Sequence, residues 1–152
     1  MPQKPNSHLL RLGRYCEPGR AYLITTVVHQ RYPLFSNLRL GRLLVAELKH
    51  THDLGLVNSL AWVIMPDHLH WLFELGDAPL SQVIGRTKSR STLTINRARG
   101  IRERFWQSGY HDRAVRAEED IRRIARYIVA NPLRAGLVDH IGDYPLWDAT
   151  WL

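Results

Sequence analysis

Two strand-like segments joined by only two residues constrain the fold more than any other feature of this sequence. Residues 57–65 and 68–75 are rich in apolar, aromatic and β-branched side chains, and only Pro66 and Asp67 lie between them. Strands joined this closely are expected to pair as an antiparallel hairpin. The fold is therefore expected to contain an antiparallel sheet centred on residues 57–75.

The remaining pattern places helices and strands around this hairpin. The expected elements are, in chain order, a strand over 22–29, a helix over 38–53 capped by Ser36 or Asn37, the hairpin, a helix over 80–98, a strand over 111–116 and a helix from Glu118 to Asn131-Pro132. This order predicts an α+β fold: a ferredoxin-like split βαβ antiparallel sheet with helices on one face and an appended C-terminal helix. A chain of 152 residues can form one core, so we expect a single domain over 21–152 behind a basic N-terminal arm, 1–20.

Charge points to an anionic partner. The formal net charge is +7, and 18 of the 21 basic residues are Arg, whose planar guanidinium pairs well with phosphate. The stretch 86–104 alone carries +6, from seven basic residues and Glu103; its basic residues are Arg86, Lys88, Arg90, Arg97, Arg99, Arg102 and Arg104. A solvated helix face would show the same pattern, so nucleic-acid binding is one of two interpretations of the charge alone.

The expected compartment is the cytoplasm. No apolar run is long enough to span a membrane, and the one cysteine, Cys16, cannot form an internal disulfide. With a nucleic acid as partner, we expect association with the nucleoid and none with a membrane.

Two histidines on the second hairpin strand could bind a metal. Side chains alternate between the faces of a strand, so His68 and His70 share one face and Leu69 and Trp71 the other. A His-x-His sequence also arises by chance. A closed zinc site is not expected, because such a site needs four protein ligands.

The last helix could complete a reaction centre. Tyr127 and Asn131 are spaced i and i+4, on the flank of an apolar stripe that includes Ile124 and Ile128. Taken singly, they are a boundary aromatic residue and a helix-ending residue before proline. A histidine pair, a tyrosine with a nearby amide and an Arg-rich segment are together what cleavage of a nucleic-acid phosphodiester by a tyrosine requires. The helix must then pack across the histidine-bearing face.

Three ordered motifs resemble a known family. They are Met65-Pro66-Asp67-His68-Leu69-His70, the segment Phe105-Trp106-Gln107-Ser108-Gly109-Tyr110-His111-Asp112-Arg113, and Ala125-Arg126-Tyr127-Ile128-Val129-Ala130-Asn131-Pro132-Leu133-Arg134 with its continuation to Val138. Together they are similar to the single-tyrosine HUH transposases, which are related to insertion sequence 200, and in particular to the REP-associated tyrosine transposases of bacteria. The resemblance extends from about Ala21 to Trp147.

The resemblance implies a set of residue roles. His68, His70 and Asn131 would be ligands of Mg²⁺ or Mn²⁺, and Tyr127 the nucleophile that forms a 5′-phosphotyrosine. The substrate would be single-stranded DNA hairpins of repetitive extragenic palindromes (REP), which the protein would cleave and rejoin. The basic residues of 86–104 and Arg113 would bind DNA, and Trp106 and Tyr110 would stack on bases unless Trp106 is buried in the core.

Other interpretations fit less well. A domesticated DNA-hairpin-binding protein that does not cleave is the main alternative. An RNA-recognition domain would carry a Gly-aromatic strand signature, and a two-histidine phosphoesterase of small nucleotides would carry two His-x-Thr/Ser motifs; both are missing. The sequence is compatible with a monomer and with a homodimer.

Overall fold

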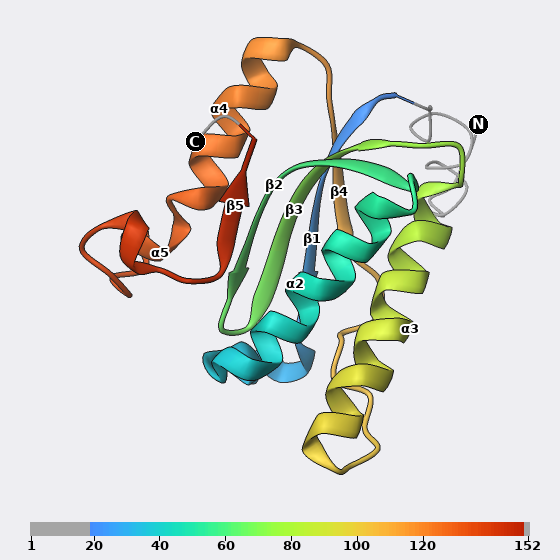
Figure 1. Cartoon of the computed structure of the whole chain (residues 1–152). Helices are drawn as coiled ribbons and strands as arrows, with labels where there is room; N and C mark the ends of the chain where they lie inside the picture. The colour runs from blue at the N-terminus through green and yellow to red at the C-terminus, as the bar shows by residue number, and fades with distance from the viewer. Residues whose placement is uncertain (1–18, 151–152) are drawn as a thin grey trace.

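The protein folds around a five-stranded antiparallel sheet with the strand order β4-β1-β3-β2-β5. Figure 1 shows the computed structural model, which describes residues 19–150. The strands are β1 (Ala21–Val27), β2 (Val57–Met65), β3 (His68–Leu75), β4 (His111–Val115) and β5 (Trp147–Ala149). The first four have the order expected of a split βαβ fold, which confirms the predicted fold class. Most of the expected N-terminal arm, with Cys16, lies outside the described residues.

The register of the central strands follows from the hairpin. β2 and β3 pair from Met65 opposite His68 to Val57 opposite Leu75, with one irregularity between Ser59 and Ala61. β1 inserts between β3 and β4 and is paired on both sides. Its β-branched and aromatic residues suit this buried central position.

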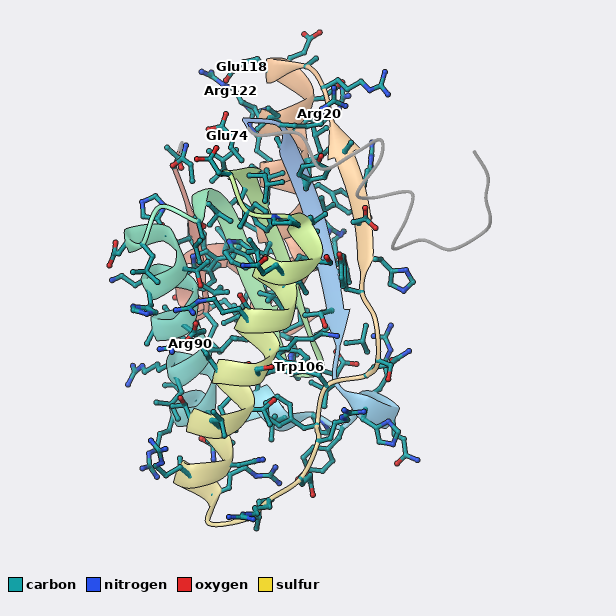
Figure 2. All side chains as sticks on the ribbon, turned by 90° about the vertical axis from the view of Figure 1, so that its right-hand side faces the viewer. Arg20, Glu74, Arg90, Trp106, Glu118 and Arg122 are labelled. Atoms are coloured by element: carbon teal, nitrogen blue, oxygen red, sulfur yellow. The ribbon has the colours of Figure 1, made fainter. Side chains whose placement is uncertain are left out.

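Helices α2 (Leu38–Asp53) and α3 (Leu80–Arg99) cover one face of the sheet. Of the two predicted caps of α2, the structure uses Asn37, whose side-chain oxygen accepts a hydrogen bond from the Leu40 N–H at 3.3 Å. α3 ends at Gly100, whose φ of +71° lies in the left-handed region that glycine adopts without strain. Figure 2 looks onto this pair of helices, with α4 behind the sheet.

Helix α4 (Glu118–Val129) covers the opposite face, as predicted for the final helix. Ile124, Ala125 and Ile128 pack there against a second apolar cluster that includes Val63 and Leu72 of the sheet. Glu118, Glu119 and Asp120 lie in the first turn, where acidic side chains interact favourably with the helix dipole.

The structure adds elements that the sequence pattern did not indicate. Pro132 has no N–H to continue α4, so the chain begins a separate short helix, α5 (Asn131–Arg134). The strand β5 pairs with β2, and the short 3-10 helices are η2 (His29–Arg31), η3 (Leu34–Ser36) and η4 (Ile141–Asp143). Between residues 19 and 150 no helix combines the length and apolar character needed to cross a membrane.

Candidate active site on the α4 face of the sheet

His68 and His70 lie on the face of the sheet that α4 covers. Leu72, two residues after His70, belongs to the apolar cluster under α4, and side chains at alternate positions share a face. The two imidazole rings are 4.7 Å apart between centroids and stand at 80° to each other. The predicted pair is therefore present as two adjacent imidazoles on one strand.

Each histidine is oriented by a hydrogen bond at Nδ1. His68 Nδ1 lies 2.7 Å from Asp67 Oδ1, and His70 Nδ1 lies 2.8 Å from Thr25 Oγ1 on β1. Metal-binding histidines typically bond through the second ring nitrogen in this way, which fixes the ring and leaves the other nitrogen for the metal. Both Nε2 atoms are thus the nitrogens available for a metal ion.

Two pKa shifts describe the electrostatics of this pair. Burial lowers the pKa of His70 to about 4, and the charges of His68, Arg134 and Arg31 add to the effect. Burial raises the pKa of Asp67, but the hydrogen bonds to His68 and Arg31 and their charges outweigh it, so the pKa lies below its usual range. Asp67 is therefore ionised and His70 neutral near pH 7, and a neutral imidazole is the form that binds metal.

Arg134 connects Tyr127 and Asn131. Its Nη2 donates to the Tyr127 carbonyl oxygen at 2.6 Å and to Asn131 Oδ1 at 2.9 Å. Its guanidinium carbon also lies 3.8 Å from the centre of the Tyr127 ring, a cation–π contact. The Tyr127 side chain remains exposed, with 62% of the residue's surface accessible. The tyrosine and the amide are thus held together by a third residue.

The α4–α5 junction lies on the same face as the histidine pair. α5 contacts β2, the strand beside β3, and the Arg134 charge acts on His70. Residues 19–150 contain no group of three His, Cys, Asp or Glu side chains suited to a metal. For a site built on His68 and His70, the expected third ligand is the side-chain oxygen of Asn131, which must then be free to bind a cation.

Asn131 meets that requirement. Its Oδ1 has a second lone pair besides the one that Arg134 uses, and its buried Nδ2 has no hydrogen-bond partner within the described residues. Two imidazole nitrogens and one amide oxygen suit Mn²⁺ better than Mg²⁺, which prefers oxygen ligands. The donor set fits a divalent cation.

Most of the Arg-rich segment lies on the other face of the sheet. α3 packs with α2, and several of its basic side chains bind protein atoms: Arg90 Nε donates to both carboxylate oxygens of Glu47 at 3.0 and 3.1 Å, Lys88 donates to the Gln107 and Gly109 carbonyls, and Arg99 pairs with Glu103. Figure 2 shows Arg90 on this helix layer. Arg86 contacts His50 at 3.4 Å. The exposed basic residues of the segment are Arg90, Arg97, Arg102 and Arg104.

Trp106 is buried in the core, which is one of the two roles that the sequence left open for it, and its ring is not offered for base stacking. Only 4% of its surface is exposed, it packs against Phe35 and Phe105, and its indole N–H donates to Ser91 Oγ at 3.0 Å. Figure 2 labels it beside α3. Tyr110 is partly buried against the same cluster. Both aromatic rings therefore pack in or against the core, a role that the sequence alone could not assign.

Arg113 is the predicted DNA-binding residue that shares the histidine face. It pairs with Leu23, which pairs on its other side with Leu72, and this cross-strand row belongs to the α4 face. His111 lies in the neighbouring row, across Thr25 from His70. Both side chains are exposed at the edge of the sheet.

Four residues of the site were not identified from the sequence: Thr25, Arg31, Asp67 and Arg134. Asp67 and Arg134 stand inside the quoted motifs, and Arg134 follows Asn131 at i+3, a spacing that brings side chains together on a helix. Thr25 and Arg31 carry no local signal, because strand register and a loop contact bring them to the histidines.

Comparison with known proteins gives one consistent result. Residues 19–131 match the family model described as "Transposase IS200 like". A REP-associated tyrosine transposase of Escherichia coli K12 is 32% identical over 87 residues, which are 56% of this chain and 50% of that relative. The chain therefore spans only half the length of that relative.

A solved structure supports the fold. The structure of a REP-associated tyrosine transposase bound to a REP hairpin matches with a TM-score of 0.74 and 23% identity, covering 97% of this chain and 82% of that one. The family model spans well over half of the sequence and includes the histidine pair, Tyr127 and Asn131. The chain belongs to the IS200-like transposase family, and its resemblance is to the REP-associated tyrosine transposases.

Proposed function

We propose that this protein is a single-strand DNA endonuclease and strand transferase that acts at REP-type hairpins through Tyr127. The observation that carries the proposal is the shared face: His68, His70, and the α4–α5 junction with Tyr127 and Asn131 lie on one side of the sheet. The similarity to a REP-associated tyrosine transposase that was solved with a REP hairpin supports the choice of substrate.

The reaction is a transesterification. The Tyr127 phenol loses its proton, its oxygen forms a bond to phosphorus, and the bond to the 3′ oxygen of the preceding nucleotide breaks, so a 3′-OH leaves and a 5′-phosphotyrosine remains. Attack by a second 3′-OH reverses these steps and rejoins DNA without ATP. The exposed position of Tyr127 allows its phenol to reach the backbone of a bound strand.

The other residues have supporting roles. His68, His70 and Asn131 would hold a divalent cation, Mn²⁺ or Mg²⁺, which supplies Lewis-acid polarisation of the phosphodiester. Asp67 and Thr25 orient the imidazoles. Arg134 holds the Tyr127 ring and the Asn131 amide in one geometry.

Adduct formation tests the proposal. The protein is incubated with Mn²⁺ and an end-labelled hairpin carrying a REP sequence of the source genome, and the products are separated on a denaturing gel. We expect a covalent protein–DNA adduct with the wild type and with Tyr32→Phe, which alters another exposed tyrosine. Tyr127→Phe should give no adduct while hairpin binding persists, and His68→Ala should behave in the same way.

Two outcomes contradict the proposal. An adduct that persists in Tyr127→Phe would assign the nucleophile elsewhere. Tight hairpin binding by the wild type with no cleavage under any divalent cation would instead identify a domesticated hairpin-binding protein.

A further inference from the structure

Arg31 approaches the histidine pair from the β1 side. It lies in η2, directly after β1, and its Nη1 contacts Asp67 Oδ2 at 3.2 Å, while the other carboxylate oxygen of Asp67 holds His68. The Arg31 side chain is 63% exposed, so most of its guanidinium faces solvent. Arg31 is thus anchored beside the site and still offers N–H donors.

The backbone around Arg31 is unusual and firmly held. Gln30 and Arg31 have φ angles of +54° and +56°, in the left-handed region that residues with side chains rarely adopt. The flanking chain is tied by hydrogen bonds from the Val28 N–H to the Asp67 carbonyl at 2.9 Å and from the His29 N–H to the Phe105 carbonyl at 2.7 Å. Strained conformations kept in this way cluster at functional sites. The Arg31 side chain that contacts Asp67 extends from this firmly held backbone.

Arg134 approaches from the opposite side. α5 packs against β2, whereas β1 lies on the other flank of β3. The two bonds to Tyr127 and Asn131 use Nη2 alone, so Nη1 and Nε keep three N–H groups without an acceptor in residues 19–150.

We propose that Arg31 and Arg134 form a clamp for the scissile phosphodiester, with each guanidinium donating to one non-bridging oxygen across the histidine pair. This inference rests on the proposed function and adds the residues that hold the reacting phosphate. Guanidinium groups make charge-assisted, geometrically specific hydrogen bonds to phosphate. The basic residues of α3 are less suited to this role, because Arg90 and Lys88 bind protein groups on the other face.

The clamp also couples substrate binding to the nucleophile. Arg134 contacts the Tyr127 ring with the guanidinium that would hold the phosphate, so the position of phosphorus relative to the phenol is set by one rigid planar group. Lysine in its place would keep the charge but lose the two-point geometry.

The test measures binding without catalysis. Hairpin oligonucleotides in which each phosphate flanking the hairpin foot is replaced in turn by a neutral methylphosphonate are titrated by fluorescence anisotropy in EDTA. For the wild type, neutralising one phosphate should weaken binding roughly tenfold, the loss expected for charge-assisted hydrogen bonds. The variant Arg31→Gln/Arg134→Gln should bind the unmodified hairpin roughly tenfold more weakly and show no further loss at that phosphate.

Arg42→Gln is the matched control for charge, because Arg42 is exposed on α2 on the other face of the sheet. It should keep the wild-type sensitivity to the neutral linkage. Arg134→Lys should lose most of the sensitivity although the net charge is unchanged. If the double variant does not fold, as judged by circular dichroism, the wild-type scan and Arg134→Lys still decide the question.

The results separate the clamp from the proposed function. A wild type that shows no phosphate of special importance, or a folded double variant that keeps full sensitivity, overturns the clamp even if adduct formation is observed. A wild type that shows the sensitivity but forms no adduct with Mn²⁺ keeps the clamp and overturns the proposed cleavage.

Discussion

The buried imidazole of His70 makes the stability of this protein depend on pH in a defined window. The pKa of a histidine in the unfolded chain is about 6.5. Burial, with smaller electrostatic contributions from neighbours that include Arg134 and Arg31, lowers the pKa of folded His70 to about 4. Between these values the unfolded state binds a proton that the folded state does not. The contribution of His70 to the free energy of unfolding is therefore fully present above about pH 6.5 and is lost progressively as the pH falls toward 4.

The magnitude follows from the two pKa values. They differ by roughly 2.5 pH units, and each unit corresponds to about 1.4 kcal/mol. The titration of His70 alone should therefore lower the free energy of unfolding by about 3 kcal/mol between pH 7 and pH 4. Asp67 acts in a different pH window. Its lowered pKa stabilises the folded state above about pH 4, and this contribution is lost as the pH falls below that value. Burial raises the pKa of Tyr144 to about 12, so the titration of this residue affects stability only above about pH 10.

Urea unfolding of the wild type and His70→Asn at pH 7, 6, 5 and 4, in EDTA, measures this contribution. Asparagine can place a polar atom near the position of Nδ1 and keep a hydrogen bond to Thr25, but it does not titrate. The stability difference between the two proteins should shrink by about 3 kcal/mol from pH 7 to pH 4. The difference in free energy of unfolding between wild type and the control Arg42→Gln should be the same at all four pH values. A stability difference between wild type and His70→Asn that is independent of pH would show that the folded state does not lower the pKa of His70.

Three further predictions concern the site, the helix layer and the basic segment. Asp67→Ala should weaken Mn²⁺ binding about 10- to 100-fold in calorimetry, because the His68 ring loses its orienting carboxylate; unchanged affinity would contradict the role of Asp67. Arg90→Met should lower the free energy of unfolding by roughly 2 kcal/mol in urea titrations, because a carboxylate that is only 7% exposed loses its partner; a neutral result would mean that Glu47 finds another donor. Neutralising Arg97, Arg102 and Arg104 together should reduce the slope of log affinity against log salt by about 2 to 3 if each contacts a phosphate, whereas an unchanged slope would move the DNA path away from the end of α3.

Much of the fold was predictable because its signals are local. The helix expected over 80–98 is observed over 80–99, and the hairpin strands have the predicted bounds, since periodicity and the Pro66-Asp67 break act within a few residues. β5 could not be predicted: three residues carry no alternation, and its position depends on pairing with β2 across the chain. The left-handed backbone at Gln30 and Arg31 was equally hidden, because neither residue favours it.

The candidate site divides in the same way. His68 and His70 could be placed on one face from alternation alone, and Tyr127 and Asn131 on one flank from their spacing. The fate of Trp106 could not be decided, because an aromatic ring serves a core as well as a base stack until its neighbours are known. The contacts of the basic segment could not be predicted for a related reason: Arg90 stands in a run of positive charge, and its partner Glu47 lies 43 positions earlier in the chain.

Which side chains share a face follows from the sequence alone, because alternation in a strand and the turn of a helix are consequences of backbone geometry. Which helix packs against each face of the sheet depends on the tertiary structure. Burial of apolar surface placed α4 on the face that carries the histidines and α3 on the opposite face. This arrangement put Arg134 on the same side as the histidines and most of the charged segment on the other. That choice depends on contacts between residues far apart in the chain, whose free energy no local pattern records.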